Sequence, residues 1–222
     1  MIDSWNDLYE LDRSIRGCDK CAPLFKRQRV NPGADDSPVV PSPVLSSPFR
    51  AQILLIGQAP GLREYATGMP FCGGAGQAIR RLFEECGLKP ELFEASVYQT
   101  SAAKCFPGRK LDRGRLQDLP PCRATLRNCQ PYLGEQIRLI DPSLIVCLGR
   151  VAMEALDALR HRKRRSMTDA LGRAEEWGHR VVVMLAHTSG ASTLLNDEGN
   201  RRRQAMGLEC IASAIRALGL NK

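Results

Sequence analysis

Four of the nine cysteines in this chain have a spacing that suits a shared metal site. Cys18 and Cys21 form a C-x-x-C pair near the amino end, and Cys105 and Cys129 follow much later. A C-x-x-C pair places two thiolates on one short turn, and two distant thiolates can then complete a tetrahedral zinc site or a [4Fe–4S] cluster. Spacing alone favours neither metal, and Cys122 is an alternative to Cys129 as the fourth ligand.

A glycine-rich segment lies between the C-x-x-C pair and the later cysteines. Residues 57–76 have the sequence G-Q-A-P-G-L-R-E-Y-A-T-G-M-P-F-C-G-G-A-G. Glycines let a backbone approach a ligand closely, and a helix that begins after such a turn has an N-terminus that favours an anion. The segment therefore predicts a ligand site that favours an anion such as a phosphate.

Together these motifs resemble the iron–sulfur uracil-DNA glycosylases, families four and five of their superfamily. The family patterns occur here in the same order, at residues 57–61, 68–76 and 104–107, at Cys129, and at the H-T-S sequence of residues 187–189. The resemblance covers about residues 18–190. It implies a monofunctional DNA glycosylase of base-excision repair, which hydrolyses the N-glycosidic bond of uracil in DNA and leaves an abasic site.

The resemblance also implies the cofactor. It favours a [4Fe–4S] cluster over zinc, with Cys18, Cys21, Cys105 and Cys129 as ligands. The fourth ligand of the family opens the helix that leads into the third strand, and the position of Cys129 before Asp141 suits that pattern better than Cys122 does.

Several residues of the base pocket follow from the same resemblance. Phe71 matches the aromatic residue that stacks on the base, and His187 matches a histidine that stabilises the negative charge developing on the leaving uracil. Gln58 replaces the glutamate common in family four; its amide can orient a water molecule but cannot take a proton from it. Ser101 replaces an asparagine that recognises the edge of uracil. The other predicted substrate-binding residues are Gly57, Ala59, Glu64 and Tyr65.

These replacements leave two alternatives open. Ser101 makes a glycosylase for another deaminated base, hypoxanthine or xanthine, a second hypothesis. Gln58 and Ser101 together permit a third, a non-catalytic iron–sulfur protein that binds DNA or senses lesions. The retained Phe71 and His187 argue for catalysis.

A basic composition suits a nucleic-acid partner. The chain has 32 Lys and Arg against 24 Asp and Glu, a formal charge of +8, although many basic proteins bind no polyanion. The phosphate contacts expected from this composition are the R-K-R-R run at residues 162–165 and the three arginines at residues 201–203. The residues predicted to contact DNA are Ser189, Leu194 as the wedge in the base stack, Arg201, Arg202 and Arg203.

The elements that would position these residues alternate along the chain. Four short apolar runs predict buried strands at residues 52–56, 96–100, 144–148 and 181–185, with helical periodicity between them. This pattern predicts an α/β fold, a three-layer α/β/α sandwich around a four-stranded parallel sheet. The loops that carry Gln58, Ser101 and His187 would then share one edge of the sheet, where open α/β folds bind ligands.

The rest of the chain suggests one compact unit in the cytosol. We expect a single domain over residues 1–222, with a Pro- and Ser-rich surface loop at about residues 31–49 and an insertion at residues 108–121. No stretch reaches the ~18 apolar residues of a membrane span, the start is unlike a signal peptide, and nine cysteines suit reduced thiols. The expected protein is a monomer in the bacterial cytosol or nucleoid. Its expected partner is uracil-containing DNA, single- or double-stranded, and not a membrane.

Overall fold

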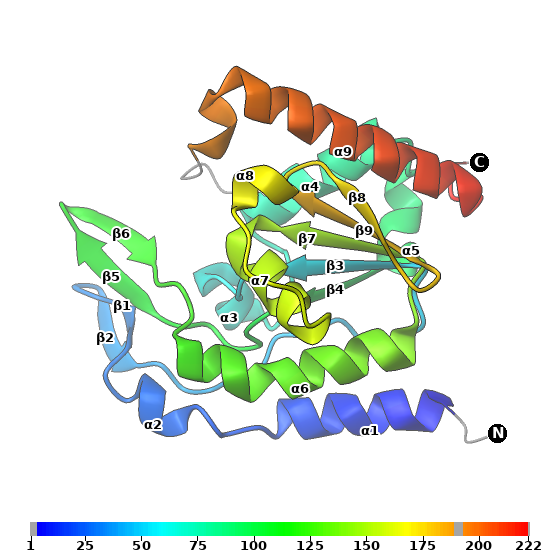
Figure 1. Ribbon diagram of the computed structural model, residues 1–222. Coiled ribbons are helices and arrows are strands. Elements are labelled where there is room, and N and C mark those ends of the chain that lie inside the picture. Colours follow the sequence, from blue (N-terminus) through cyan, green and yellow to red (C-terminus); the bar gives the residue numbers. More distant parts are fainter. Residues whose placement is uncertain (1–3, 189–192, 222) are drawn as a thin grey trace.

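Apolar strands form the centre of the computed structural model, which describes residues 4–188 and 193–221 (Figure 1). The main sheet has the strand order β4-β3-β7-β9-β8. Four of its strands run parallel, and they are β3 (Ile53–Gly57), β4 (Val97–Ser101), β7 (Leu144–Leu148) and β9 (Arg180–Leu185). Every residue of β3, β4 and β7 is buried, as expected of parallel strands covered on both faces. The four predicted strands and their parallel arrangement are confirmed.

A fifth strand at the edge of this sheet was missing from the prediction. β8 (Ala174–Trp177) pairs antiparallel with β9, which follows it after a short turn through Gly178 at a φ of 62°. Its sequence, A-E-E-W, lacks an apolar run, because only one side of an edge strand contacts the core. The sheet is therefore mixed at one edge, within the predicted α/β class.

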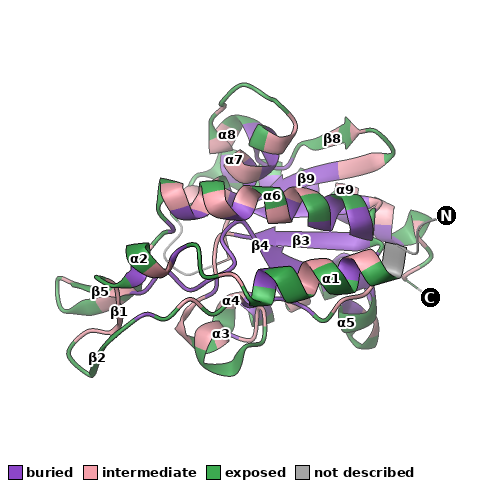
Figure 2. Cartoon of the chain, turned by 90° about the horizontal axis from the view of Figure 1, so that it is seen from below, coloured by how far each residue is buried: buried purple, intermediate pink, exposed green. Residues whose placement is uncertain are grey.

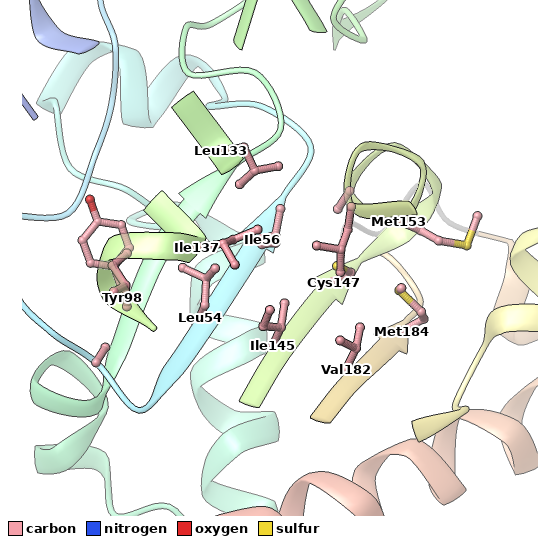
Figure 3. Packing of buried hydrophobic residues seen from close by; sticks show 14 of the residues in the cluster. Leu54, Ile56, Tyr98, Leu133, Ile137, Ile145, Cys147, Met153, Val182 and Met184 are labelled. Carbon is pink, nitrogen blue, oxygen red and sulfur yellow. The ribbon is translucent and has the colours of Figure 1, made fainter. Parts of the chain in front are cut away.

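Helices cover both faces of the sheet, which gives the predicted three layers (Figure 1). Alternate strand residues point to opposite faces. Leu54, Ile56 and Ile145 pack against one group of helices, with Leu133 and Ile137 of that group among their neighbours (Figure 3). That group is α1 (Ser4–Arg16), α6 (Arg123–Ile140) and α7 (Gly149–Leu159). The opposite face packs against α4 (Gly74–Glu85), α5 (Phe93–Ser96) and α9 (Glu198–Ala217).

A small antiparallel sheet extends from one end of the molecule (Figure 1). Its strand order is β2-β1-β5-β6, and its strands are β1 (Arg29–Asn31), β2 (Asp35–Pro38), β5 (Arg109–Asp112) and β6 (Arg115–Asp118). The predicted loop at residues 31–49 thus contains β2, and the predicted insertion is a hairpin. Arg113 and Gly114, with φ of 49° and 75°, form its two-residue turn, because primed turns with positive φ match the twist of paired strands.

Short elements complete the described chain. They are α2 (Ala22–Phe25), α3 (Leu62–Thr67), α8 (Met167–Ala170) and the 3-10 turns η1 (Pro90–Leu92) and η2 (Leu194–Asn196). Among the residues that the structure describes, no helix combines the length and the apolar character that crossing a membrane requires.

Candidate active site and cysteine cluster

The carboxyl ends of the parallel strands open into a pocket of about 760 Å³. Its walls come from the residues that follow β3, β4 and β9, from the end of β7, from the segment between α3 and α4, and from the β5–β6 hairpin. Most of the predicted substrate-site and catalytic residues line it together: Gly57, Gln58, Ala59, Glu64, Phe71, Ser101 and His187.

Phe71 has a constrained backbone next to the pocket. Its φ of 48° lies in the left-handed region, which costs free energy for a residue other than glycine and persists only where the surroundings enforce it. Arg80 donates a hydrogen bond to its carbonyl oxygen at 2.8 Å. A methyl group on Gly76 would lie only 1.7 Å from the same oxygen. The glycine at the start of α4 therefore allows the close approach that holds Phe71 in place.

The ring of Phe71 reaches the ends of β3 and β4. A methyl group on Gly57 would lie 2.8 Å from Phe71 Cζ and 3.3 Å from Ser101 Oγ. Gly57 thus leaves the space in which the ring edge and the serine hydroxyl come together. A flat group bound in the pocket could stack on the ring and meet a hydroxyl that both donates and accepts hydrogen bonds.

His187 stands at the end of β9, on the opposite side of β7 from Gly57. A methyl group on Gly149, which has a φ of 78°, would lie 3.0 Å from His187 Cβ. The next residue, Thr188, donates a hydrogen bond from its hydroxyl to the carbonyl of Ala75 at 3.3 Å, which joins this loop to the start of α4. Burial lowers the pKa of His187 below its ordinary 6.5. The side chain is therefore neutral at pH 7 and can still donate an N–H.

The loops that carry Gln58 and Ser101 are joined to each other. Ala102 N–H donates to Gly57 O at 2.9 Å and Ala103 N–H donates to Gln58 O at 3.0 Å, which extends the pairing of β3 and β4 beyond the strands. Hydrogen bonds of this kind fix the end of the sheet.

Lys104 lies buried beneath this edge, and burial lowers its pKa to about 7, although the nearby thiols of Cys129 and Cys105 oppose the shift. It is only 1% exposed, and its Nζ donates to Thr100 Oγ1, Ser101 O and Gln136 Oε1 at 2.8, 2.6 and 2.7 Å. Each of the three ammonium protons thus has an acceptor, as a buried charge requires. The sequence motif contained Lys104, but its role in supporting Ser101 is evident only in the fold.

Glu64 has a supporting position, although the sequence suggested a substrate contact. Its two carboxylate oxygens accept hydrogen bonds from Gly73 N–H at 2.8 Å and Gly61 N–H at 3.1 Å. The side chain therefore links the start of α3 to the turn before α4. Such charge-assisted bonds to backbone groups stabilise the glycine-rich segment around Phe71.

One wall of the pocket was not anticipated from the sequence. Arg109, Leu116, Gln117 and Asp118 of the β5–β6 hairpin line it, together with Leu119. Burial raises the pKa of the Asp118 carboxyl, although Arg109 and a hydrogen bond from the Leu62 backbone oppose the shift. Alternating charged residues with one leucine per strand gave no strand signal that could have assigned this segment to the pocket.

Tyr65 lies away from the pocket. Its ring packs on Phe106 with centroids 5.2 Å apart, and its hydroxyl accepts a hydrogen bond from Val40 N–H at 3.3 Å. It belongs to a small apolar cluster that includes Cys21 and Cys105. The predicted substrate contact of Tyr65 is therefore not among the residues that the fold brings together.

The described members of the predicted DNA-contacting set, Leu194 and Arg201 to Arg203, are not among the residues that line the pocket. Ser189 falls outside the described residues, and Leu194 begins η2. Arg201 donates to the carbonyls of Leu195 and Asn196 at 3.0 and 2.9 Å, Arg202 pairs with Glu198 at 2.5 Å, and Arg203 donates to Asn200 at 3.0 Å. These arginines support the turn into α9.

The cysteines predicted as ligands come from three parts of the chain. Cys21, Cys105 and Cys129 are 5%, 6% and 6% exposed, and Cys18 is half-buried. Burial, followed by the nearby thiols of Cys129, Cys21 and Cys18, raises the pKa of Cys105 to about 12. Burial raises the pKa of Cys129 as well, with Cys21 and Cys18 adding to it and a hydrogen bond from the Lys104 backbone opposing it. Lys104 N lies 3.5 Å from Cys129 Sγ, and Asn128 Nδ2 lies 3.5 Å from Cys21 Sγ, so the C-x-x-C segment and the loop that carries Cys105 both contact α6.

Cys122 occupies a different environment. It is exposed at the N-cap of α6, with its sulfur 3.3 Å from Thr125 Oγ1. The helix therefore begins at Cys122 and not at Cys129, contrary to the sequence expectation. Cys129 lies inside α6, where it faces Cys105. Among residues 4–188 and 193–221, no group of three or more His, Cys, Asp or Glu side chains is arranged to hold a metal ion. The thiol groups of Cys18, Cys21, Cys105 and Cys129 match the donor chemistry of either a zinc or an iron–sulfur site.

Comparison with known proteins identifies the family to which this chain is similar. Residues 43–207 match the Uracil DNA glycosylase superfamily. The type-4 uracil-DNA glycosylase of Pyrobaculum aerophilum is 30% identical over 168 residues, which cover 75% of this chain and 73% of that protein. The type-4 enzyme of Archaeoglobus fulgidus is 28% identical over 187 residues, 83% and 82% of the two chains. That of Thermotoga maritima is 31% identical over 165 residues, 73% and 76%.

Proposed function

This chain belongs to the uracil DNA glycosylase superfamily, and we propose that it hydrolyses the N-glycosidic bond of uracil in DNA, leaving an abasic site for base-excision repair. The observation that supports this most directly is one pocket lined by Phe71, Gln58, Ser101 and His187 at the carboxyl edge of the sheet. Its type-4 relatives, by name uracil-DNA glycosylases, agree with that assignment.

The pocket is suited to a nucleotide taken out of the base stack. A base inside a duplex cannot be reached, so the enzyme must rotate the nucleotide out of the helix and bind it in a separate cavity. The pocket volume of about 760 Å³ has room for a base with its sugar. In this proposal, uracil stacks on Phe71 and its polar edge meets the hydroxyl of Ser101.

His187 stabilises the charge that develops as the bond breaks. The electrons of the C1′–N1 bond move to uracil, and an N–H of neutral His187 donates to the carbonyl O2, where part of the negative charge collects. Because burial keeps this imidazole neutral, it acts as an electrostatic hydrogen-bond donor and retains its proton.

Gln58 completes the hydrolysis by orienting water toward C1′ of the sugar. A carboxamide cannot remove the proton from that water. The sugar carries positive charge once the bond is largely broken, so a positioned water attacks it and then loses its proton to solvent. General-base assistance is worth about two to four powers of ten in rate, and we therefore expect a slow enzyme.

Cys18, Cys21, Cys105 and Cys129 are the proposed ligands of a [4Fe–4S] cluster. Such a group supplies a structural link between the segment before α2, the loop after β4 and α6. The proposal predicts about four iron atoms per chain in anaerobically purified protein. Replacing Cys129 by alanine removes the iron, whereas the matched Cys122→Ala variant retains it. Stoichiometric zinc, or loss of iron from the Cys122 variant alone, would overturn this assignment.

We further infer a monomer that works in the cytoplasm. A monomer leaves the pocket and the exposed β5–β6 hairpin open to a DNA strand. None of the nine cysteines, which all lie in the described part of the chain, forms a disulfide, as is usual in a reducing compartment.

One assay tests the function. Purified protein is incubated with duplexes that contain uracil, hypoxanthine, xanthine or thymine at one position, and alkali then cleaves any abasic site. Scission of the uracil duplex alone supports the proposal, with His187→Ala as the inactive control and His179→Ala, an exposed histidine, as the matched active control. Scission at hypoxanthine or xanthine in place of uracil would assign the other base specificity that Ser101 suggests. Retarded mobility without scission would refute catalysis.

A further inference from the structure

The β5–β6 hairpin extends from the pocket wall beyond the body of the molecule (Figure 1). Its base belongs to the pocket, through Arg109, Leu116 and Asp118. Most of the remaining hairpin is exposed, as Figure 2 shows for β5 and its neighbours. An exposed arm that begins at a substrate pocket is placed to contact the part of the substrate outside that pocket.

The strand register decides which side chains point toward the pocket. Arg109 pairs with Asp118, and Leu111 pairs with Leu116. Paired residues of antiparallel strands lie on the same face, and so do residues two apart. Arg109, Leu116 and Asp118 line the pocket, so Leu111 is the outermost residue of the same face. It is 60% exposed, so its apolar side chain is free to contact a ligand that extends beyond the pocket.

The hairpin also carries an excess of positive charge at its tip. Residues 109–118 contain four basic and two acidic residues. Lys110 pairs with Asp112 at 3.5 Å, and Arg109 pairs with Asp118 at 3.0 Å. Arg113 and Arg115 form no ion pair with any other described residue. Two arginines without an acidic partner near the tip, and an exposed leucine on the pocket-facing side of the same hairpin, match a ligand that offers phosphate groups and apolar base or sugar faces.

The base of the hairpin is firmly attached to the pocket. Arg109 donates to Asn31 Oδ1 at 2.9 Å, and Leu119 N–H donates to Gly108 O at 2.8 Å. The carboxylate of Asp118 accepts a hydrogen bond from the Leu62 backbone at the start of α3. The tip is therefore held at a defined position relative to Phe71 and the glycine-rich segment.

We propose that the β5–β6 hairpin is a second DNA-contacting element, which binds the strand next to the extruded nucleotide. Arg113 and Arg115 contact backbone phosphates, and Leu111 packs against the bases that border the gap. This inference rests on the proposed function, because it takes its DNA substrate from it. It assigns the apolar wedge to Leu111, in a different element from Leu194.

Charge removal at the tip tests the phosphate contacts. The double variant Arg113→Asn/Arg115→Gln keeps a residue that tolerates positive φ in the turn. We expect the affinity for a uracil-containing duplex to fall about tenfold at moderate salt and the slope of log K against log salt to decrease by about two. Binding is measured by fluorescence anisotropy at several salt concentrations.

The matched control removes two charges at the opposite edge of the sheet. Lys89 precedes η1 and Arg138 lies in the last turn of α6, both near the amino ends of the strands. Lys89→Gln/Arg138→Gln should leave affinity and slope unchanged. Equal losses in both double variants would mean that only net charge matters, and wild-type binding by the hairpin variant would overturn the proposal.

Leu111→Ala tests the wedge. We expect single-turnover uracil release from duplex DNA to slow about tenfold, because the gap in the base stack is no longer filled. Release from a single-stranded oligonucleotide, which needs no wedge, should be unchanged. Equal rates on the duplex for Leu111→Ala and wild type would reject the wedge role.

Failure of the two proposals can be told apart. A wild-type protein that releases no uracil refutes the proposed function, and the anisotropy experiment on uncleaved duplex still decides the hairpin contact. If a hairpin variant has a lowered thermal midpoint, Arg115→Gln alone, outside the turn, serves in its place with an expected slope change of about one.

Discussion

Two arginine-rich segments of this chain look alike in the sequence and differ in the fold. Residues 160–165 have the sequence R-H-R-K-R-R, and residues 109–115 have R-K-L-D-R-G-R. In the first, Arg160 and Arg162 pair with Glu175 of β8 at 2.8 and 2.6 Å, and Arg165 pairs with Glu175 and with Asp157. In the second, the arginines at the tip extend from the molecule without an acidic partner among the described residues.

The difference teaches that the number of basic residues in a run does not identify a nucleic-acid contact. Burial alone would raise the pKa of Glu175, but the hydrogen bonds of Arg165 and Arg160 and the charges of Arg165 and Arg162 outweigh it and hold that pKa at about 2. The first segment therefore stabilises the junction of α7 and β8, and each of its four arginines already has an acidic partner. Only the second offers uncompensated charge beside the pocket, and it is the better candidate for binding DNA.

The largest expected effect concerns the pocket that the hairpin borders. His187→Ala should reduce single-turnover uracil release by about 10²–10³-fold, the usual cost of one donor to a developing anion. The thermal midpoint should change little, since the residue is at the end of a strand whose core is intact. A larger loss of activity in Gln58→Ala than in His187→Ala would contradict these roles. It would mean that the orientation of water contributes more to the rate than the hydrogen bond from His187.

The second effect belongs to the ion-paired segment and should appear in stability alone. Glu175→Gln removes the charge that three arginines share, and we expect the free energy of unfolding to fall by about 2 kcal/mol. Urea denaturation measures this, with Glu176→Gln, an exposed neighbour in β8, as the matched control. Uracil release per folded molecule should equal that of the wild type; a specific loss of activity would show that the two segments are not separate in function.

A smaller effect follows from pH. The folded-state pKa of Glu175 lies below its ordinary 4.5, so the stability it contributes is complete above pH 4.5 and is lost as pH falls toward 2. The stability difference between wild type and Glu175→Gln should therefore shrink between pH 5 and pH 3 in urea denaturation. A difference that stays constant over this range would mean that the ion pairs do not hold the carboxylate charged.

The smallest expected effect is a change in DNA affinity, and it tests the comparison of the two arginine-rich segments most directly. Arg162→Gln/Arg164→Gln removes as much charge as the hairpin double variant, from the segment that the sequence favoured for phosphate contacts. We expect less than a twofold change in DNA affinity and an unaltered salt slope, because these side chains pair with Glu175 and Glu154. A slope reduced by about two would reverse the assignment of the two segments.

The central sheet could be predicted because its signal is local. Runs such as L-I-V-C-L at 144–148 are apolar throughout, and such runs predict strands covered on both faces. The hairpin could not be predicted in this way, since β5 and β6 are half-exposed and charged, and their pairing depends on a turn made by Arg113 and Gly114 in place of the usual Asn-Gly.

The candidate site, like the fold, could be predicted from the sequence only in part. The ordered motifs were enough to select Gln58, Phe71, Ser101 and His187, and the fold brings all four to one pocket. Tyr65 shares the same motif, yet it faces the cysteine side, because a helix turns neighbouring residues to different sides. Glu64 of the same motif lines the pocket, and only the fold shows that its carboxylate also supports two backbone turns.

By itself, the sequence determined the layers of this protein, the edge of the sheet at which the pocket opens and the thiols available for a metal. All of these depend on periodicity and on residue type. Only the tertiary structure decided between Cys122 and Cys129 as neighbour of Cys105, placed Asp118 and Leu116 in the pocket wall, and distinguished a paired arginine run from an exposed one. These outcomes depend on which side chains, distant in the sequence, are packed together where water is excluded. Residue spacing along the chain does not specify such contacts.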